Sequence, residues 1–291
     1  MIDFEFHQAN DLDHAFALLA DYGDDARLMS GGTALVLQMK QRFSQPGHVI
    51  GLRRIAGLGS IEETSEGSVR IGALCTQRQV ENHPLVSERI PLVAGAYRHV
   101  ATPRIRNMAT VGGGLAHGDP NQDPPPSLIA LGASVVLSSA SGGERVVPAE
   151  ELFVDYFETD VRPGEIVTGL VVPPAPDGAG TAYLKFLPRT ADDYATVSVA
   201  AVVTPDEAGN CGDIRVVLGS VGLTPIRATA AEDSLRGQPL TDETIGAAAA
   251  MVQDAVDPLE DHRGSTEYKR EMAEVFTRRA VRQAMTNAGM M

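Results

Sequence analysis

The sequence predicts an α+β fold, and three regions of the chain carry this prediction. The first stretch of about 55 residues alternates short apolar runs with a helical pattern, which is typical of a small parallel βαβ unit. Residues 182–220 hold three apolar runs separated by polar turns, the pattern of an antiparallel meander. Beyond residue 240, two helical patterns follow plausible N-cap residues. The C-terminal region is therefore expected to combine an antiparallel sheet with helices.

The opening unit is expected to contain three short strands, over residues 2–6, 26–29 and 49–52. A helix between the first two strands is predicted by four apolar residues at helical spacing, Ala15, Phe16, Leu18 and Leu19, and Gly23 ends it. A glycine-rich turn over 30–34 follows the second strand and leads into a helical or irregular segment. Open α/β sheets bind ligands at such carboxyl ends of strands, so this turn is a candidate ligand site.

Between residues 60 and 173 the pattern changes to mixed strands and helices. Helices are expected over 77–82, 91–99 and 128–131. Strands are expected over 69–73, 135–138, 145–147 and 166–172, and the middle two form a hairpin around a Ser-Gly-Gly turn. The proline- and glycine-rich run 173–180 is the best boundary. It gives a first domain over 1–175, divided into 1–57 and 58–175, and a second domain over 176–291.

The second domain begins with the meander, whose strands are expected over 182–186, 197–204 and 214–220. A turn near 207–210 joins the last two strands. Two helices are then expected over 243–255 and 267–288, with Thr241 and either Ser265 or Thr266 as their N-caps.

The charge of the chain excludes several classes of partner. The 291 residues include 24 basic and 38 acidic side chains, a formal net charge of −14, which repels nucleic acid and anionic membrane surfaces. The sequence shows neither an apolar run long enough for a transmembrane helix nor the pattern of a signal peptide. We therefore expect a cytoplasmic protein with no membrane insertion and no nucleic-acid partner.

The cysteine and histidine content limits the metal chemistry. Cys75 and Cys211 are the two cysteines, so any all-cysteine iron–sulfur centre must lie on a partner. A buried apolar role for each cysteine is favoured over a reactive thiol. The seven histidines show no ligand spacing with one another or with cysteine, and no metal site is predicted.

Two glycine-rich segments, 30–35 (SGGTAL) and 110–114 (TVGGG), are the strongest functional signal. Without side chains, consecutive backbone N–H groups can close on an anion, and glycine adopts positive φ freely. Either segment alone would as readily be a structural turn. As a pair they favour binding of a pyrophosphate, and the acidic run that follows the second segment up to Asp123 strengthens this interpretation.

Four motifs carry a family resemblance: 29–35 (MSGGTAL), 105–113 (IRNMATVGG), 116–128 (AHGDPNQDPPPSL) and 261–270 (DHRGSTEYKR). They resemble segments of the FAD-binding medium subunits and domains of the molybdenum hydroxylases, which include carbon monoxide dehydrogenase and xanthine dehydrogenase. A further stretch resembles the part of the family that borders the flavin ring, namely Lys185-Phe186, Arg189 and 192–195 (DDYA). The matches follow the order found in the family and span nearly the whole chain.

The resemblance implies a two-subdomain FAD-binding domain of the PCMH or VAO type, followed by a domain like the C-terminal domain of carbon monoxide dehydrogenase flavoprotein. It implies FAD as the cofactor and no catalytic side chain, because the flavin performs the chemistry. It also implies an electron-transfer subunit that takes electrons from [2Fe–2S] clusters on a small partner subunit and passes them to an external acceptor. A large partner subunit would hold the molybdenum cofactor, in a heterotrimer or its dimer.

The resemblance also implies roles for individual residues. Backbone N–H groups of 29–35 would hold the pyrophosphate, and 110–114 would close over it from the other subdomain. Asp123 would accept ribose hydroxyls, or else cap the following helix. Lys185 and Tyr194 would stabilise charge on the flavin ring and cover one face, or else be an exposed strand lysine and a core tyrosine. The expected cofactor-binding residues are Met29, Ser30, Gly31, Gly32, Thr33, Ala34, Leu35, Val100, Ala101, Thr110, Gly113, Gly114, His117, Gln122, Asp123, Ile166, Val167, Lys185 and Tyr194.

Some of these assignments have open alternatives. The apolar candidates, Val100, Ala101, Ile166 and Val167, would line the ring or the adenine, but such residues are core by default. Asp119 precedes a proline and equally suits a turn. For Asp261, Arg263 and Tyr268 a structural role is favoured, in which an Arg–Asp pair fixes a loop onto a helix.

The sequence departs from the family pattern at a few positions. Ala34 stands where the family often has serine, Ser30 replaces a common alanine, and Pro103-Arg104 replaces a Pro-Gln pair. Gly114 and His117 lie where relatives vary. Two alternative functions stay open: a free-standing FAD-dependent oxidoreductase of the same fold, and a binding module that has lost FAD.

Overall fold

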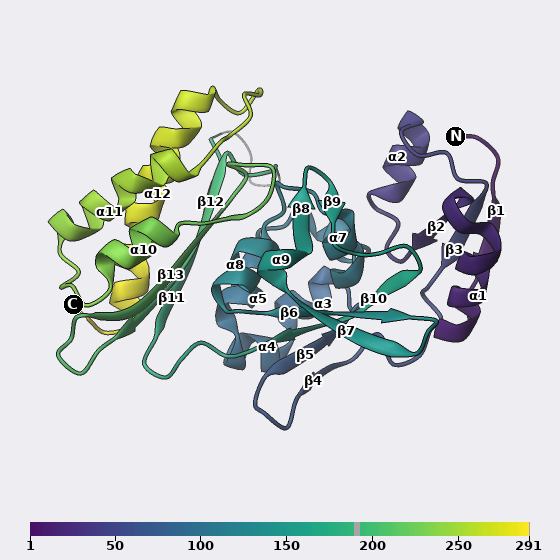
Figure 1. Ribbon diagram of the computed structural model, residues 1–291, viewed down its shortest axis with the longest axis horizontal. Helices are drawn as coiled ribbons and strands as arrows, with labels where there is room; N and C mark the ends of the chain where they lie inside the picture. The colour runs from purple at the N-terminus through teal and green to yellow at the C-terminus, as the bar shows by residue number, and fades with distance from the viewer. Residues whose placement is uncertain (189–192, 291) are drawn as a thin grey trace.

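The computed structural model describes residues 1–188 and 193–290. Figure 1 shows three parts in a row along the long axis: an N-terminal unit, a mixed middle part, and a sheet covered by helices. Helices and sheets are both present and separate by region, so the predicted α+β fold is confirmed. None of the described helices combines the length and hydropathy that crossing a membrane requires.

The N-terminal unit is a parallel three-stranded sheet of order β1-β3-β2, as the βαβ pattern predicted. Asp11 caps α1, because its carboxylate accepts a hydrogen bond from the N–H of His14. The first strand begins at Glu5 rather than Ile2, since pairing with β3 starts there and Ile2 is exposed. The elements are β1 (Glu5–Gln8), α1 (Leu12–Tyr22), the 3₁₀ turn η1 (Gly23–Asp25), β2 (Ala26–Met29), α2 (Leu35–Gln41) and β3 (His48–Gly51).

The middle part is built on an antiparallel five-stranded sheet of order β4-β5-β10-β6-β7. The predicted hairpin is confirmed as β6 and β7, and the predicted strand near 166–172 is β10. The strands are β4 (Ile61–Glu63), β5 (Val69–Gly72), β6 (Ser134–Ser139), β7 (Gly143–Pro148) and β10 (Glu165–Val172), beside a small pair of β8 (Phe153–Asp155) and β9 (Glu158–Thr159).

Short helices accompany this sheet. The predicted helices near 77–82 and 91–99 are present, but the third begins at Pro124 rather than Leu128. Three prolines occupy its first turn, where a missing N–H leaves no helical hydrogen bond unmade. The helices are α3 (Gln77–Asn82), α4 (Pro84–Arg89), α5 (Pro91–Arg98), α6 (Pro103–Arg106), α7 (Val111–His117), α8 (Pro124–Ala130) and α9 (Ala149–Leu152).

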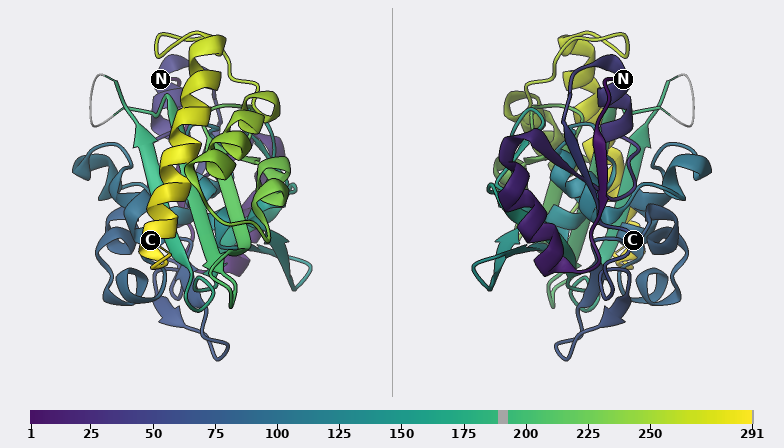
Figure 2. Two further views of the ribbon diagram at one scale, coloured as in Figure 1. Left: turned by 90° about the vertical axis from the view of Figure 1, so that its left-hand side faces the viewer. Right: turned by 90° about the vertical axis from the view of Figure 1, so that its right-hand side faces the viewer.

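The C-terminal part confirms the predicted meander, in the antiparallel order β11-β12-β13-β14. Thr241 and Ser265 cap the last two helices, each accepting from a backbone N–H three residues on. Figure 2 shows α12 lying across one face of this sheet, while α5 and α8 contact its other side. The elements are β11 (Gly180–Phe186), β12 (Val197–Pro205), β13 (Cys211–Gly219), β14 (Ile226–Arg227), α10 (Thr229–Leu235), α11 (Asp242–Ala255) and α12 (Thr266–Asn287).

The buried apolar side chains form three clusters, one for each part. Strand β10 connects two of them, because Ile166 packs into the N-terminal cluster and Val167 into the middle cluster. Neighbouring residues of a strand point to opposite faces, so β10 holds these two parts together from one short segment. Cys75 and Cys211 are buried and unpaired, in agreement with the apolar interpretation.

Candidate functional site

The two glycine-rich segments meet in the structure. The Ser30 and Thr110 hydroxyl oxygens lie 2.7 Å apart, although 80 positions separate them in the chain. A Cβ at Gly31 would collide with the carbonyl oxygen of Met108, and a Cβ at Gly113 would lie 2.7 Å from the Ser30 Oγ. Glycine is therefore needed on both sides of this contact, because the backbones approach too closely for a side chain.

The first segment has open backbone donors. Within residues 1–188 and 193–290, no acceptor receives the N–H groups of residues 31–35. Gly32 has a φ of +73°, which turns the chain after β2. Ala34 precedes α2 and supplies no side-chain cap. Consecutive unpaired N–H groups of this kind form a concave site for an anion.

The second segment is the start of a helix rather than an open loop. Thr110 caps α7, and its Oγ1 accepts from the N–H of Gly113 at 3.2 Å. The N–H groups of Val111 and Gly112 donate to carbonyl oxygens within residues 73–75. The expectation that main-chain amides of this segment close over a pyrophosphate is corrected for these three groups, because the cap and the neighbouring backbone already accept their hydrogen bonds.

Two amide side chains lie beside this first turn of α7. A Cβ at Gly114 would be 3.1 Å from Gln122 Oε1 and 3.6 Å from Gln77 Nε2. The opposite amide atoms, Gln122 Nε2 and Gln77 Oε1, are buried and have no hydrogen-bond partner among the described residues. One unpaired donor and one unpaired acceptor suit a ligand with hydroxyl groups, such as a sugar. The sequence analysis included Gln122 but missed Gln77, for which the sequence gives only a helix-start signal.

Asp123 and Lys185 form a buried ion pair. Lys185 Nζ donates to Asp123 Oδ2 and to the carbonyl oxygen of His99, both at 2.9 Å. The Tyr183 hydroxyl donates to Asp123 Oδ1 at 2.7 Å. Asp123 makes no capping bond to α8, so the helix-cap interpretation is wrong, and the Lys185 side chain is only 1% exposed, so it is not an exposed strand lysine. Ribose binding by Asp123 stays a prediction.

Burial dominates the electrostatics of this pair. Loss of hydration raises the pKa of Asp123 from 3.8 to about 6, although Lys185 and the two hydrogen bonds act in the opposite direction. Burial likewise raises the pKa of Tyr183 well above its ordinary value. His117, whose ring lies 5.1 Å from Phe157, has a pKa lowered mainly by burial. A neutral imidazole there offers one donor and one acceptor.

The turn at 99–101 is held from both sides. Lys185 binds the carbonyl oxygen of residue 99, while Arg106 Nη1 donates to those of Val100 at 2.6 Å and Ala101 at 2.9 Å. Arg106 is itself buried and pairs with Glu81 at 2.9 Å. This clamp maintains Ala101 at a φ of +38°, a region that alanine rarely occupies. The polar role of Arg106 was missed, although the residue lies within a recognised motif.

The apolar wall candidates do not share one surface. Ile166 and Val167 are 1% and 6% exposed and pack in different clusters, on opposite faces of β10. At most one of them can face a common ligand. The core interpretation therefore accounts for their burial, and a cofactor role for either stays a prediction.

Tyr194 is 44% exposed, so the core-tyrosine interpretation is wrong. Its hydroxyl donates to Asp119 Oδ2 at 2.7 Å, and the guanidinium of Arg263 lies 5.5 Å from its ring centroid. Arg263 also pairs with Asp193 at 2.8 Å and with Asp261 at 3.1 Å. These contacts link the segment before β12 to the segment before α12.

Two parts of the recognised segments need a further statement. The predicted pair of Arg263 and Asp261 is present, partly exposed rather than buried, and Lys269 of α12 contacts Asp261 at 2.9 Å. Arg189 and Asp192 lie outside the described residues.

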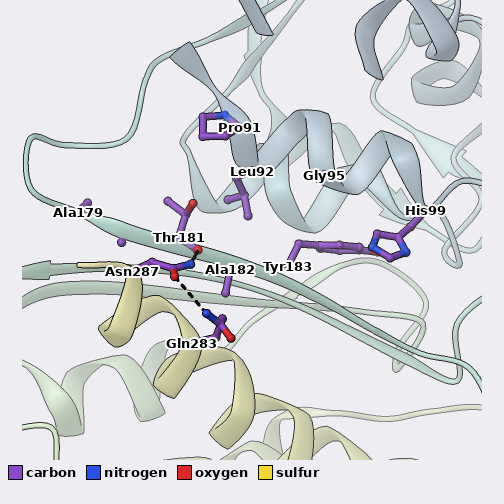
Figure 3. Close-up of a pocket in the computed structure, with 11 residues that line it drawn as sticks. Pro91, Leu92, Gly95, His99, Ala179, Thr181, Ala182, Tyr183, Gln283 and Asn287 are labelled. Atoms are coloured by element: carbon purple, nitrogen blue, oxygen red, sulfur yellow. Dashed lines mark hydrogen bonds between the residues drawn. The ribbon is translucent and has the colours of Figure 1, made fainter. Parts of the chain in front are cut away.

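A pocket of about 490 Å³ lies between α5, β11 and α12. Figure 3 shows Tyr183 and His99 at one end of it and Gln283 with Asn287 at the other. The described residues that line this pocket include none from either glycine segment. It reaches the candidate site only through Tyr183, whose hydroxyl binds Asp123.

These features together define a class of protein. Open N–H groups at 31–35 suit phosphate, the unpaired amide atoms of Gln77 and Gln122 suit sugar hydroxyls, and the exposed ring of Tyr194 suits an aromatic ring. The residues present therefore fit a nucleotide cofactor held between the N-terminal unit and the middle part.

The comparisons with known proteins agree with this class. A family model described as the FAD binding domain in molybdopterin dehydrogenase matches residues 2–175, and one described as the CO dehydrogenase flavoprotein C-terminal domain matches residues 182–284. The carbon monoxide dehydrogenase medium chain of Hydrogenophaga pseudoflava is 38% identical over 97% of this chain and 96% of its own length. A solved structure of carbon monoxide dehydrogenase from the same organism has a TM-score of 0.94, covering 99% of both chains.

A second relative comes from nicotine metabolism by its printed name. The 6-hydroxypseudooxynicotine dehydrogenase complex subunit alpha of Paenarthrobacter nicotinovorans is 35% identical over 98% of this chain and 95% of its own length. The chain therefore belongs to the family of FAD-binding domains of molybdopterin dehydrogenases, with the C-terminal domain of the carbon monoxide dehydrogenase flavoproteins. The resemblance, the oxidoreductase class and the FAD cofactor inferred from the motifs are confirmed.

Proposed function

We propose that this chain is the flavin subunit of a heteromeric molybdenum hydroxylase. It binds FAD, takes electrons from [2Fe–2S] clusters on a small partner subunit and passes them to an external acceptor, while a large partner subunit carries the molybdenum cofactor. FAD, when bound, supplies the ring that accepts and releases electrons, and the chain positions it. The assembly is a heterotrimer or its dimer, in which residues 1–175 hold the cofactor and 176–291 form the second domain.

The observation that carries this proposal is the contact between Ser30 and Thr110, with open N–H groups beside it at 31–35. In this proposal residues 29–35 hold the pyrophosphate, and Gln77 and Gln122 receive hydroxyl groups of the cofactor. Lys185, which already neutralises Asp123, holds the turn at 99–101 in place rather than contacting the cofactor directly.

The need for partners is supported by the chain's own cysteines. Cys75 and Cys211 are both buried and unpaired, and two cysteines cannot ligate an all-cysteine cluster. The printed names of relatives at 34–38% identity include carbon monoxide, glyceraldehyde and nicotine as substrates. Such different substrates beside one conserved chain length favour substrate selection on another subunit.

A cytoplasmic location is part of the proposal. It is supported by the two free, buried thiols, since disulfides are the usual state of cysteine pairs in oxidising compartments. The strongly acidic composition also keeps the chain away from anionic membrane surfaces.

The test compares the purified chain with the complex recovered with its partner subunits. We expect FAD in both, and reduction of FAD by a donor only in the complex. Turnover of a donor by the chain alone would instead support a free-standing FAD-dependent oxidoreductase. A complex that contains no flavin would support a binding module that has lost the cofactor.

A further inference from the structure

Three side chains with metal-binding atoms lie together on the N-terminal sheet, away from the glycine segments. Glu5 and His7 are two residues apart on β1 and so point to the same face, and His48 is the register partner of Glu5 on β3. His7 Nε2 and His48 Nδ1 are 3.0 Å apart. Glu5 Oε2 lies 3.8 Å from each of these nitrogens.

This cluster is singular within the described part of the chain. Of the His, Cys, Asp and Glu side chains there, these three form the one group whose ligand atoms all lie within 4.8 Å of one another. Sequence spacing gave no sign of it, because 41 positions separate the two histidines and only the parallel pairing of β1 with β3 brings them together.

Tyr22 fixes the two imidazole rings. Its ring stacks on His48 with centroids 3.7 Å apart and on His7 at 4.9 Å. Each histidine side chain is only 20% exposed, whereas Glu5 is 74% exposed and free to swing. The site therefore has two fixed nitrogen atoms and one adjustable carboxylate, open to solvent for further ligands.

The contacts within the protein alone leave the cluster incompletely satisfied. The two imidazoles share one hydrogen bond, and Glu5 at 3.8 Å is too distant to hydrogen-bond either ring. A cation with metal–nitrogen bonds of about 2.1 Å would bridge nitrogens 3.0 Å apart at an angle of about 90°. That angle is the one between adjacent ligands in square-planar and octahedral complexes, which Cu²⁺ and Ni²⁺ adopt with nitrogen and oxygen ligands.

We propose that Glu5, His7 and His48 form a site for one first-row divalent transition-metal ion, with Cu²⁺ and Ni²⁺ preferred over Zn²⁺. Two imidazoles and a carboxylate select against Mg²⁺ and Ca²⁺, which prefer oxygen ligands. The ion ties β1 to β3 directly. Because β3 leads into Leu52, whose N–H donates to the carbonyl of Met29 at 2.9 Å, the ion also steadies the base of the first glycine segment.

The test uses the full chain without an affinity tag and stripped of metal by a chelator. Calorimetric titration with Ni²⁺ should give one ion per chain, and Ni²⁺ should raise the thermal unfolding temperature while Mg²⁺ does not. His7→Gln and His48→Gln should each weaken Ni²⁺ binding roughly tenfold or more, and Glu5→Gln should have a smaller effect. His262→Ala, which removes an exposed histidine outside the cluster, is the matched control.

A second measurement guards against variants that fold poorly. Electron paramagnetic resonance of the wild-type chain with one equivalent of Cu²⁺ should show coupling to two imidazole nitrogens. The proposal is overturned if the spectrum lacks this coupling, or if both cluster variants bind Ni²⁺ as the wild-type chain and the His262 variant do.

Discussion

The two glycine-rich segments have similar composition and opposite hydrogen bonding. In residues 31–35 the backbone N–H groups face no acceptor among the described residues, whereas those of 111–113 all donate within the protein. The glycines therefore serve different ends. Gly31 allows one backbone to approach another while its neighbours stay open, and Gly112 lets α7 pack against Ala73, 2.6 Å from where its Cβ would lie. A glycine run in a sequence does not say which of these it provides.

Alanine at Gly31 is expected to have the largest effect on this difference. The added Cβ collides with the Met108 carbonyl, which belongs to the backbone and cannot rotate away, so the loop must shift. We expect the variant to lose most of its bound FAD, and its free energy of unfolding to fall by about 1–3 kcal/mol. Flavin absorbance per chain and urea denaturation measure the two quantities.

Gly112→Ala is the matched comparison in the second segment. Its Cβ meets Ala73 and should also lower the free energy of unfolding by about 1–3 kcal/mol, but it leaves the open N–H groups of 31–35 untouched. The folded fraction should then keep its FAD. Gly246→Ala, where a Cβ meets open space, should lower neither quantity. Equal loss of FAD from the Gly31 and Gly112 variants would contradict the different roles assigned to the segments.

A pH series separates the two regions further, because only the second one continues into a titrating buried carboxylate. Folding raises the pKa of Asp123 from 3.8 to about 6, so between these pH values the folded chain holds a proton that the unfolded chain has lost. The contribution of Asp123 to stability is present below pH 3.8 and is lost as the pH rises to about 6.

Asp123→Asn isolates this contribution, since asparagine does not titrate. The free energy of unfolding of the wild-type chain, measured relative to this variant by denaturation, should fall across the same pH window. A difference that stays constant or rises with pH would show that Lys185, rather than burial, controls the pKa of Asp123.

Ser30→Ala is expected to give the smallest effect. It removes one hydrogen bond between the segments and leaves Thr110 free to cap α7, so the free energy of unfolding should fall by only about 1 kcal/mol. A double-mutant cycle with Thr110→Val measures the coupling between the two hydroxyls. A coupling energy near zero would mean that the 2.7 Å contact adds nothing to the approach of the segments.

Local patterns in the sequence predicted most of the elements. The parallel opening unit, the β6–β7 hairpin, the meander and the caps at Thr241 and Ser265 all follow from residues close in sequence. Helix α7 was missed, because three consecutive glycines are poor helix formers and only the Thr110 cap and packing against residues 73–75 make it a helix.

The site residues divide in the same way. Motif positions brought Ser30, Thr110 and Asp123 to attention, but their contacts were not predictable. Asp123 binds Lys185 from a strand 62 positions away instead of capping its own helix. Gln77 and the cluster around His48 carried no local signal, since their neighbours come from distant parts of the chain.

The sequence by itself determined the family, the cofactor class and the periodicity of the elements, because these depend on residues near one another along the chain. The tertiary structure decided which backbone N–H groups stay open, which carboxylate is neutralised by which lysine, and which histidines become neighbours. The physical reason is that hydrogen bonding and burial are set by whatever packs against a group, and here those partners lie 41 to 80 positions away.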